Sequence, residues 1–258
     1  MLKSVVHNAK IKGLATVAPK TSACLLDDPD LYNGDVKKIT RVIESSGFKY
    51  RRVAAENVTS SDLCFQAAEN LLENMKIDKN SIDGIVFVSS TPDYFMPPTS
   101  CVLHNRLGLN PDCAMFDVNH GCAGYVYGLW LAALMLNANL KRILLLVGDT
   151  FNKYTDMFRN HTAPVFGDAG SATLLEYDEK ALPMYFDIGS QTSNYEGIIC
   201  RNGAFRNPPQ KDDFYEDGGF KYNSSMDGMK VFKFTTEMVP QSILNALAIS
   251  GTSVSELD

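Results

Sequence analysis

The stretch that decides the fold is "AMFDVNHGCAGYVYGLWLAALMLNANLKRILLLVGD", residues 114–149. Its two ends are short apolar runs of the kind that form strands covered on both faces, and its middle is a longer apolar segment of helical length. A strand, a helix and a second strand in this order form a βαβ unit with two parallel strands. We therefore predict a parallel sheet at the centre of the molecule.

The flanking sequence extends this unit in both directions. "SSDLCFQAAENLLENM" (residues 60–75) repeats apolar side chains at helical spacing and predicts an amphipathic helix. "IVFVSS" from Ile85 predicts a buried strand, and "PPTSCVLHNRLGL" predicts a short helix beginning near Thr99. "SATLLEY" and "PMYFDIGSQ" predict further strands, antiparallel at the edge of the same layer system. Together these elements indicate an α/β fold with a mixed, mainly parallel sheet and a buried central helix.

The last part of the chain changes character twice. From Ile198 to Met226 it is polar and rich in Gly, Pro and Asp, which predicts a long surface excursion that borders a site. "MKVFKFTTEMVPQSILNALAISG" then returns to helical spacing, with a kink or break at Pro240. We assign residues 1–178 to a first half that carries the site and 179–258 to the start of a second half. A crossover helix is normally followed by a strand, so we expect the second half to be incomplete.

Composition limits the classes of protein. The 258 residues, 45% hydrophobic and 21% charged, suffice for the core of one large domain or two small ones. A formal net charge of −6 argues against a nucleic-acid partner. Six cysteines without a C-x-x-C pair, and no secretory leader, predict reduced thiols in the cytoplasm. The longest apolar run, residues 125–136, is shorter than the roughly 18 residues of a membrane span, so we predict no membrane partner.

Cys122 has two interpretations. Cysteine is often a small buried filler, and the helix that follows Cys122 is apolar on nearly every face. However, Gly121 and Gly124 remove bulk where the strand turns into the helix, and the positive end of a helix favours a thiolate. We therefore predict that Cys122 is a nucleophile at the base of a pocket.

Four motifs carry a resemblance to a known family. "FDVNHGCAGYVYGLWLA", "ILLLVGD", "VFGDAGSATLL" and "MDGMKVFKFTTEMV" occur in the order found in the ketoacyl synthase III branch (3-oxoacyl-acyl-carrier-protein synthase III) of the thiolase-like condensing enzymes. The resemblance implies a layered thiolase-like fold, a homodimer and no cofactor. It implies that Cys122 is acylated by an acyl thioester and that a malonyl unit on acyl carrier protein is then decarboxylated and condensed onto the acyl group, in fatty-acid or related biosynthesis.

The resemblance also assigns roles around the nucleophile. "PDYFMPP" matches the loop whose aromatic residue closes the acyl pocket of the partner subunit, which gives Phe95 or Met96 that role; ordinary loop packing is the alternative. His120 is a candidate pocket residue or base, although neighbouring positions at such a turn usually diverge. We expect Asp168, in "FGDAGSA", to accept backbone N–H groups rather than perform chemistry.

A local excess of basic residues offers a docking site for an acidic acyl carrier protein, with Lys49, Arg51 and Arg52 as candidates beside Lys37, Lys38 and Arg41. A solvated helix face is the alternative. Members of the family stack the adenine of coenzyme A on a tryptophan shortly before the segment matching "GFKYRRVA", whereas the single tryptophan here, Trp130, lies in the apolar helix. Acyl-CoA and acyl carrier protein both remain open as donors.

The family's catalytic His, in an "HQAN"-like motif, and its Asn lie beyond the segment matched here. We therefore expect a continuation or a second chain to supply them. Three hypotheses follow: an acyltransferase acting through Cys122, a truncated or non-catalytic subunit that needs a partner, and a cysteine hydrolase of thioesters. No metal is predicted, because His120-x-Cys122 alone is too little for zinc.

Overall fold

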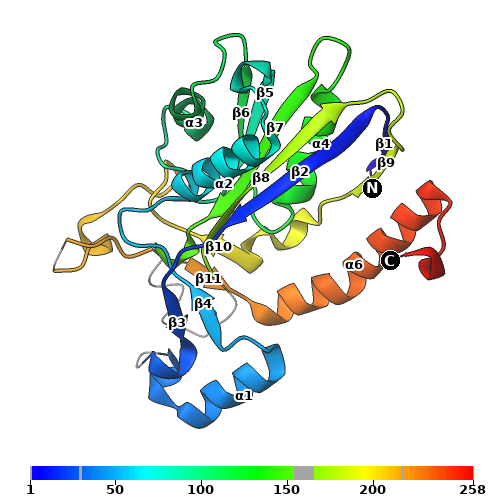
Figure 1. Ribbon diagram of the computed structural model, residues 1–258. Helices are drawn as coiled ribbons and strands as arrows, with labels where there is room; N and C mark the ends of the chain where they lie inside the picture. The colour runs from blue at the N-terminus through cyan, green and yellow to red at the C-terminus, as the bar shows by residue number, and fades with distance from the viewer. Residues whose placement is uncertain (1, 29–30, 154–165, 217, 223, 258) are drawn as a thin grey trace.

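The computed structural model (Figure 1) describes residues 2–28, 31–153, 166–216, 218–222 and 224–257. Its central sheet has the strand order β2-β8-β7-β5-β6, which are Ala9–Val17, Ala169–Tyr177, Arg142–Asp149, Gly84–Val88 and Ala114–Val118. β5 pairs in parallel with β6 and β7, whereas β8 is antiparallel to β7 and β2. Only β8 opposes the common direction in this sheet, which confirms the predicted mixed, mainly parallel α/β fold.

Helices cover both faces of the sheet. α2 (Ser60–Met75) and α3 (Thr99–Leu107) pack on one face, and α4 (Gly124–Met135) packs on the other (Figure 1). Successive residues of β5 point alternately into these two cores: Phe87 packs with α2 and α3, and Val88 packs with α4. Because both faces are covered, every residue of β5 is buried, which explains its uninterrupted apolar sequence.

Two predicted strands lie elsewhere than expected. β8 is antiparallel, as predicted, but it is an inner strand, because β2 pairs along its outer side. The register between β2 and β8 shifts between Ile11 and Gly13, and this irregularity obscures the alternation by which β2 could have been recognised. β9 (Met184–Ile188) is not part of the central sheet; it pairs with β1 (Leu2–Val6) in a separate two-stranded sheet. The division near residue 178 stays a prediction.

The remaining elements form two smaller units. β3 (Ser22–Cys24) and β4 (Tyr50–Arg52) form a hairpin that carries α1 (Val36–Ser46), seen at the lower end of Figure 1. β10 (Ile198–Cys200) and β11 (Ser224–Met226) pair at the base of the predicted excursion. α6 (Gly228–Ser250) is one continuous helix, so Pro240 does not break it. Short 3₁₀ turns occur at Leu25–Asp27, Leu31–Gly34, Lys79–Ser81, Phe151–Lys153, Thr192–Gly197, Lys211–Asp213 and Val254–Glu256.

Candidate active site

Cys122 lies in the tight turn between β6 and α4. The N–H of Gly124 donates to the carbonyl of Gly121 across 2.7 Å and closes this turn. The N-cap position of α4 is Ala123, which offers no side-chain acceptor to the first N–H groups of the helix. The Cys122 side chain is exposed. A free thiol therefore lies beside the positive end of a helix, as predicted.

Two glycines hold α4 close to the sheet. A Cβ atom on Gly124 would lie 2.7 Å from Val88 Cγ1, and one on Gly128 would lie 2.7 Å from both Val88 Cγ2 and Leu145 Cδ1. Only glycine allows this close approach, which fixes the start of the helix and the turn before it. The opposite side of α4 leaves Leu134 50% exposed, so the helix is buried on its sheet side only.

The described residues leave the Cys122 side chain open. Cys122 is exposed and does not line the cavity described below. The prediction relied on an apolar helix being covered all round, whereas among the described residues the side of α4 that includes Val126 and Leu134 remains open. The pocket around the thiol therefore stays a prediction.

His120 packs against α4 through Tyr127. Its ring stacks on that of Tyr127 with centroids 4.3 Å apart, and the Tyr127 hydroxyl lies 3.3 Å from Ser190 Oγ. Within the described part of the chain, no hydrogen bond joins His120 to Cys122. Its part in the pocket or as a base stays a prediction.

A partly buried carboxylate, that of Asp149, joins the ends of β5 and β7. Asp149 Oδ1 accepts hydrogen bonds from Ser89 Oγ (3.0 Å), Ser90 N (2.8 Å) and Thr91 Oγ1 (3.0 Å). Burial raises the pKa of Asp149, and these hydrogen bonds oppose that rise. The Thr150 N–H in turn donates to Thr91 Oγ1 at 3.0 Å. Sequence reasoning missed this network, although polar residues directly after two parallel strands were its signal.

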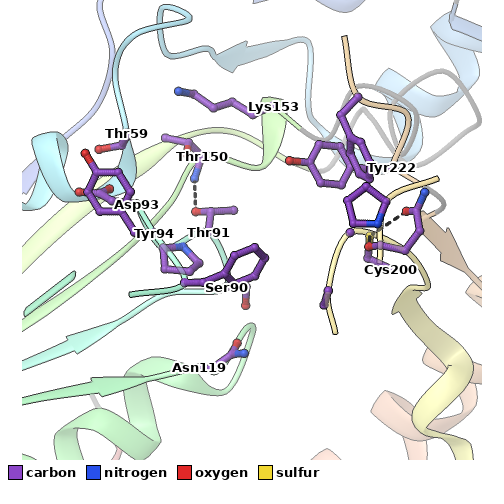
Figure 2. Close-up of a pocket in the computed structure, with 17 residues that line it drawn as sticks. Thr59, Ser90, Thr91, Asp93, Tyr94, Asn119, Thr150, Lys153, Cys200 and Tyr222 are labelled. Atoms are coloured by element: carbon purple, nitrogen blue, oxygen red, sulfur yellow. Dashed lines mark hydrogen bonds between the residues drawn. The ribbon is translucent and has the colours of Figure 1, made fainter. Parts of the chain in front are cut away.

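A cavity of about 720 Å³ opens beside this network (Figure 2). One wall is the loop after β5, residues 90–95, together with Thr150 and Lys153 after β7 and Asn119 before the Cys122 turn. The opposite wall is formed by Cys200, the last residue of β10, and by the segment between β10 and β11, which includes Tyr222. The predicted surface excursion therefore borders a cavity, and this cavity adjoins the segment that carries the thiol.

Phe95 and Met96 project from the loop after β5. Their exposed fractions are 77% and 82%. The ring centroids of Phe95 and Phe205 are 5.9 Å apart, and Phe205 belongs to the excursion. Phe95 also lines the cavity. This contact is a case of the loop packing named as the alternative; the role of either residue in a partner's acyl pocket stays a prediction.

Two of the predicted docking residues have structural partners. Arg51 pairs with Asp28 (Nη2 to Oδ2, 3.6 Å) and donates to Asn152. Arg52 Nη1 donates to the carbonyl groups of Pro19 and Lys20 at 3.2 and 3.0 Å. Arg52 nevertheless remains exposed, as do Lys49 and, on α1, Lys37, Lys38 and Arg41.

Asp168 is buried and accepts two backbone hydrogen bonds. Its Oδ2 accepts from Ala54 N at 2.7 Å and its Oδ1 from Asn152 N at 3.1 Å. The predicted role as a backbone acceptor is confirmed.

The described residues contain no cluster of three or more His, Cys, Asp or Glu side chains placed to hold a metal ion. No described helix combines the length and the apolar character needed to cross a membrane.

Comparison with known proteins identifies the family. Residues 116–192 match the family model of 3-oxoacyl-[acyl-carrier-protein (ACP)] synthase III. A putative 3-oxoacyl-[acyl-carrier-protein] synthase 3 of Campylobacter jejuni is 34% identical over 96% of this chain and 72% of its own length. Beta-ketoacyl-[acyl-carrier-protein] synthase III 2 of Bacillus subtilis is 32% identical over 98% of this chain and 75% of its own length.

A solved structure gives the same result. The crystal structure of a 3-oxoacyl-(acyl-carrier protein) synthase from Burkholderia xenovorans superposes with a TM-score of 0.88 at 31% identity, covering 100% of this chain and 73% of the other. Sequence relationship and architecture therefore agree over nearly the whole chain. The protein belongs to the 3-oxoacyl-[acyl-carrier-protein] synthase III family of condensing acyltransferases.

Proposed function

We propose that this protein takes an acyl group from a thioester onto Cys122 and condenses it with a malonyl unit carried by an acyl carrier protein. The observation that carries the proposal is the exposed thiol of Cys122 at the start of α4, beside N–H groups that have no side-chain cap. Family membership supplies the type of reaction.

The first half-reaction is a thioester exchange. The Cys122 thiolate attacks the acyl carbon, a new carbon–sulfur bond forms, and the donor leaves as a thiolate that takes up the proton lost by Cys122. The two thioesters are of similar energy, so activation and alignment of the thiol are the main requirements. The N–H groups at the start of α4, with that of Cys122, stabilise the oxyanion of the tetrahedral intermediate.

The second half-reaction forms the carbon–carbon bond. Malonyl thioester loses carbon dioxide, its enolate carbon attacks the acyl carbon on Cys122, and the Cys122 thiolate leaves. The enolate oxygen needs hydrogen-bond donors while it carries charge. His120 packs on Tyr127 and His104 bonds the carbonyl of Asn110 at 2.9 Å, so neither is placed to serve as that donor. We propose that these donors come from outside the described residues.

A second candidate is a subunit that is acylated but needs further polypeptide for condensation. α6 exposes large apolar side chains, among them Met229 (76%), Phe232 (63%) and Leu244 (55%). Exposed apolar surface of this kind marks a face that another chain segment covers. This candidate is the incomplete subunit predicted from the sequence.

We also propose two interactions. β6 is at the edge of the central sheet and exposes Met115 (44%) and Phe116 (49%), which supports a homodimer formed through this edge. The basic surface, defined as Lys37, Lys38, Arg41 and Lys49, supports docking of an acidic acyl carrier protein through complementary charge.

The test is a two-step assay. The protein is incubated with hexanoyl-CoA or hexanoyl carrier protein and its intact mass is measured; malonyl carrier protein labelled in its free carboxyl group is then added. An acyl adduct followed by labelled carbon dioxide supports condensation. An adduct without carbon dioxide release supports the incomplete subunit. Multiple turnovers to free hexanoic acid support a thioester hydrolase and contradict both candidates, as does the absence of any adduct.

A further inference from the structure

The cavity adjoins the segment that carries Cys122. Asn119 lines it three residues before the thiol, and Gly121 lies so close to Ser90 that a Cβ atom there would be 3.4 Å from Ser90 Oγ. The loops after β5 and β6 lead to helices on opposite faces of the sheet, α3 and α4. A crevice at such a point, at the carboxyl ends of parallel strands, is a common place for a ligand. Its volume of about 720 Å³ is sufficient for a small-molecule group.

The described walls of this cavity combine apolar side chains, among them Phe95 and Phe220, with hydroxyl and amide groups. None of the described lining residues is Leu, Ile, Val or Met. Hydroxyl and amide side chains lie along the wall formed by the sheet, where Asn119, Ser90, Thr91 and Thr150 follow one another in Figure 2. The facing wall adds Tyr222 and Asn202. An unsubstituted alkyl chain would displace water from these groups without replacing its hydrogen bonds.

Some of these polar groups are occupied within the protein. The Thr91 hydroxyl is committed to Asp149 and to the Thr150 N–H, and the Asn202 amide donates to Asp213 and to the carbonyl of Lys221. By contrast, the Asn119 amide and the Thr150 hydroxyl make no hydrogen bond within the described part of the chain. Both side chains line the cavity, one from each side of the β5 loop; Asn119 is exposed, whereas Thr150 is 2% exposed.

The charged groups favour a neutral ligand. Asp93 Oδ2 accepts from Ser61 Oγ at 2.6 Å, and Lys153 Nζ donates to the carbonyl of Glu56 at 2.7 Å. One acid and one base therefore line the cavity, and each already has a partner within the protein. A net charge on the acyl group would be attracted by one and repelled by the other.

We infer that the cavity binds an acyl group bearing a neutral hydrogen-bonding substituent, a hydroxyl or an amide, in preference to an unsubstituted fatty acyl group. The inference rests on the proposed acylation of Cys122 and names the class of acyl group that the site accepts. Asn119 and Thr150 are the specificity-determining residues: the amide and the hydroxyl each both donate and accept, and so can pair with such a substituent.

The test compares acylation rates by intact mass with hexanoyl-CoA, 3-hydroxyhexanoyl-CoA and 6-hydroxyhexanoyl-CoA, three thioesters of equal chain length. We expect at least one hydroxyacyl thioester to acylate the protein about tenfold faster than hexanoyl-CoA, because a site built to pair a hydroxyl discriminates against its absence. In Asn119→Leu and Thr150→Val the preference should fall at least threefold. Thr235→Val, on the exposed face of α6, is the matched control and should keep it.

Three results would overturn the inference. Hexanoyl-CoA that reacts as fast as both hydroxyacyl thioesters contradicts it while leaving acylation of Cys122 intact. A hydroxyacyl preference that survives unchanged in both variants contradicts the assignment of Asn119 and Thr150. Absence of any adduct contradicts the proposed function, and this inference with it. Asn119 is exposed and has no hydrogen bond within the described chain, so its variant remains informative if Thr150→Val does not fold.

Discussion

Gly124 lies so close to Val88 that a Cβ atom on Gly124 would be 2.7 Å from Val88 Cγ1. Gly124 is the first residue of α4, and Val88 is the last residue of β5. The contact therefore fixes the start of the helix against the centre of the sheet. Because Cys122 precedes Gly124 by two residues, the same contact sets the position of the thiol.

Gly124→Ala should destabilise the protein by about 1–3 kcal/mol, because a methyl group there forces Val88 or the helix to move. Urea unfolding measures the change in the free energy of unfolding. Gly228→Ala is the matched control: a Cβ atom on Gly228, at the start of α6, meets no atom within 4 Å, so its stability should be nearly unchanged. Equal stability of the two variants would contradict the close packing of α4.

The pH dependence of stability tests the partly buried Asp149 network. Burial raises the pKa of Asp149 above the ordinary value of 3.8. Between that value and its folded pKa, the folded state binds more protons than the unfolded state, so the contribution of Asp149 to the free energy of unfolding falls as pH rises. Above its folded pKa the contribution levels off.

Asp149→Asn removes this titration and keeps an oxygen that accepts from Ser89, Ser90 and Thr91. The unfolding free energy of the parent minus that of the variant should therefore decrease from about pH 4 upward and then become constant. Chemical denaturation at several pH values measures this difference. A difference that rises with pH would contradict the raised pKa of Asp149.

The exposed edge of β6 predicts the site of self-association. Phe116→Asp places a charge on this edge and should weaken a homodimer at least tenfold, because an unpaired charge in an apolar contact is costly. Sedimentation velocity over a concentration series measures the change. Leu14→Asp, on the opposite edge strand β2, is the control and should associate like the parent protein. A parent protein that stays monomeric at high concentration would contradict the proposed homodimer.

The basic residues of α1 should matter for acylation by an acyl carrier protein but not for acylation by acyl-CoA. Reversing the charges of Lys37, Lys38 and Arg41 to Glu should slow acylation by an acyl carrier protein about tenfold at low salt and leave acylation by acyl-CoA unchanged. The effect should shrink as salt is added. Lys180→Glu, in the exposed turn after β8, is the control. A loss of equal size with both donors would show that α1 does not recognise the carrier.

Much of the central fold could be predicted from the sequence, because the apolar pattern of each segment follows directly from which of its faces are buried. β5 is buried on both faces and is apolar throughout, and α2 has one apolar side. The tight turn before α4 could also be predicted, because glycines mark the places where the helix meets the sheet. These signals are local in sequence.

The features that were missed depend on partners distant in sequence. The inner position of β8 requires β2, whose alternation is obscured by a register shift near Ile11. The exposure of Val126 and Leu134 on the far side of α4 depends on which segments pack there, which no local pattern records. The stacking of His120 on Tyr127 and the hydrogen bonds to Asp149 likewise arise only when separate segments meet.

The most direct test of the account is the mass of the protein after incubation with an acyl thioester. The parent protein and Cys200→Ala, which removes the other exposed cysteine, should each gain one acyl group, and Cys122→Ala should gain none. Tryptic peptide mapping should place the adduct on Cys122. An adduct that persists in Cys122→Ala, or a parent protein that no acyl-CoA or acyl carrier protein modifies, would contradict the assignment of Cys122 as the nucleophile.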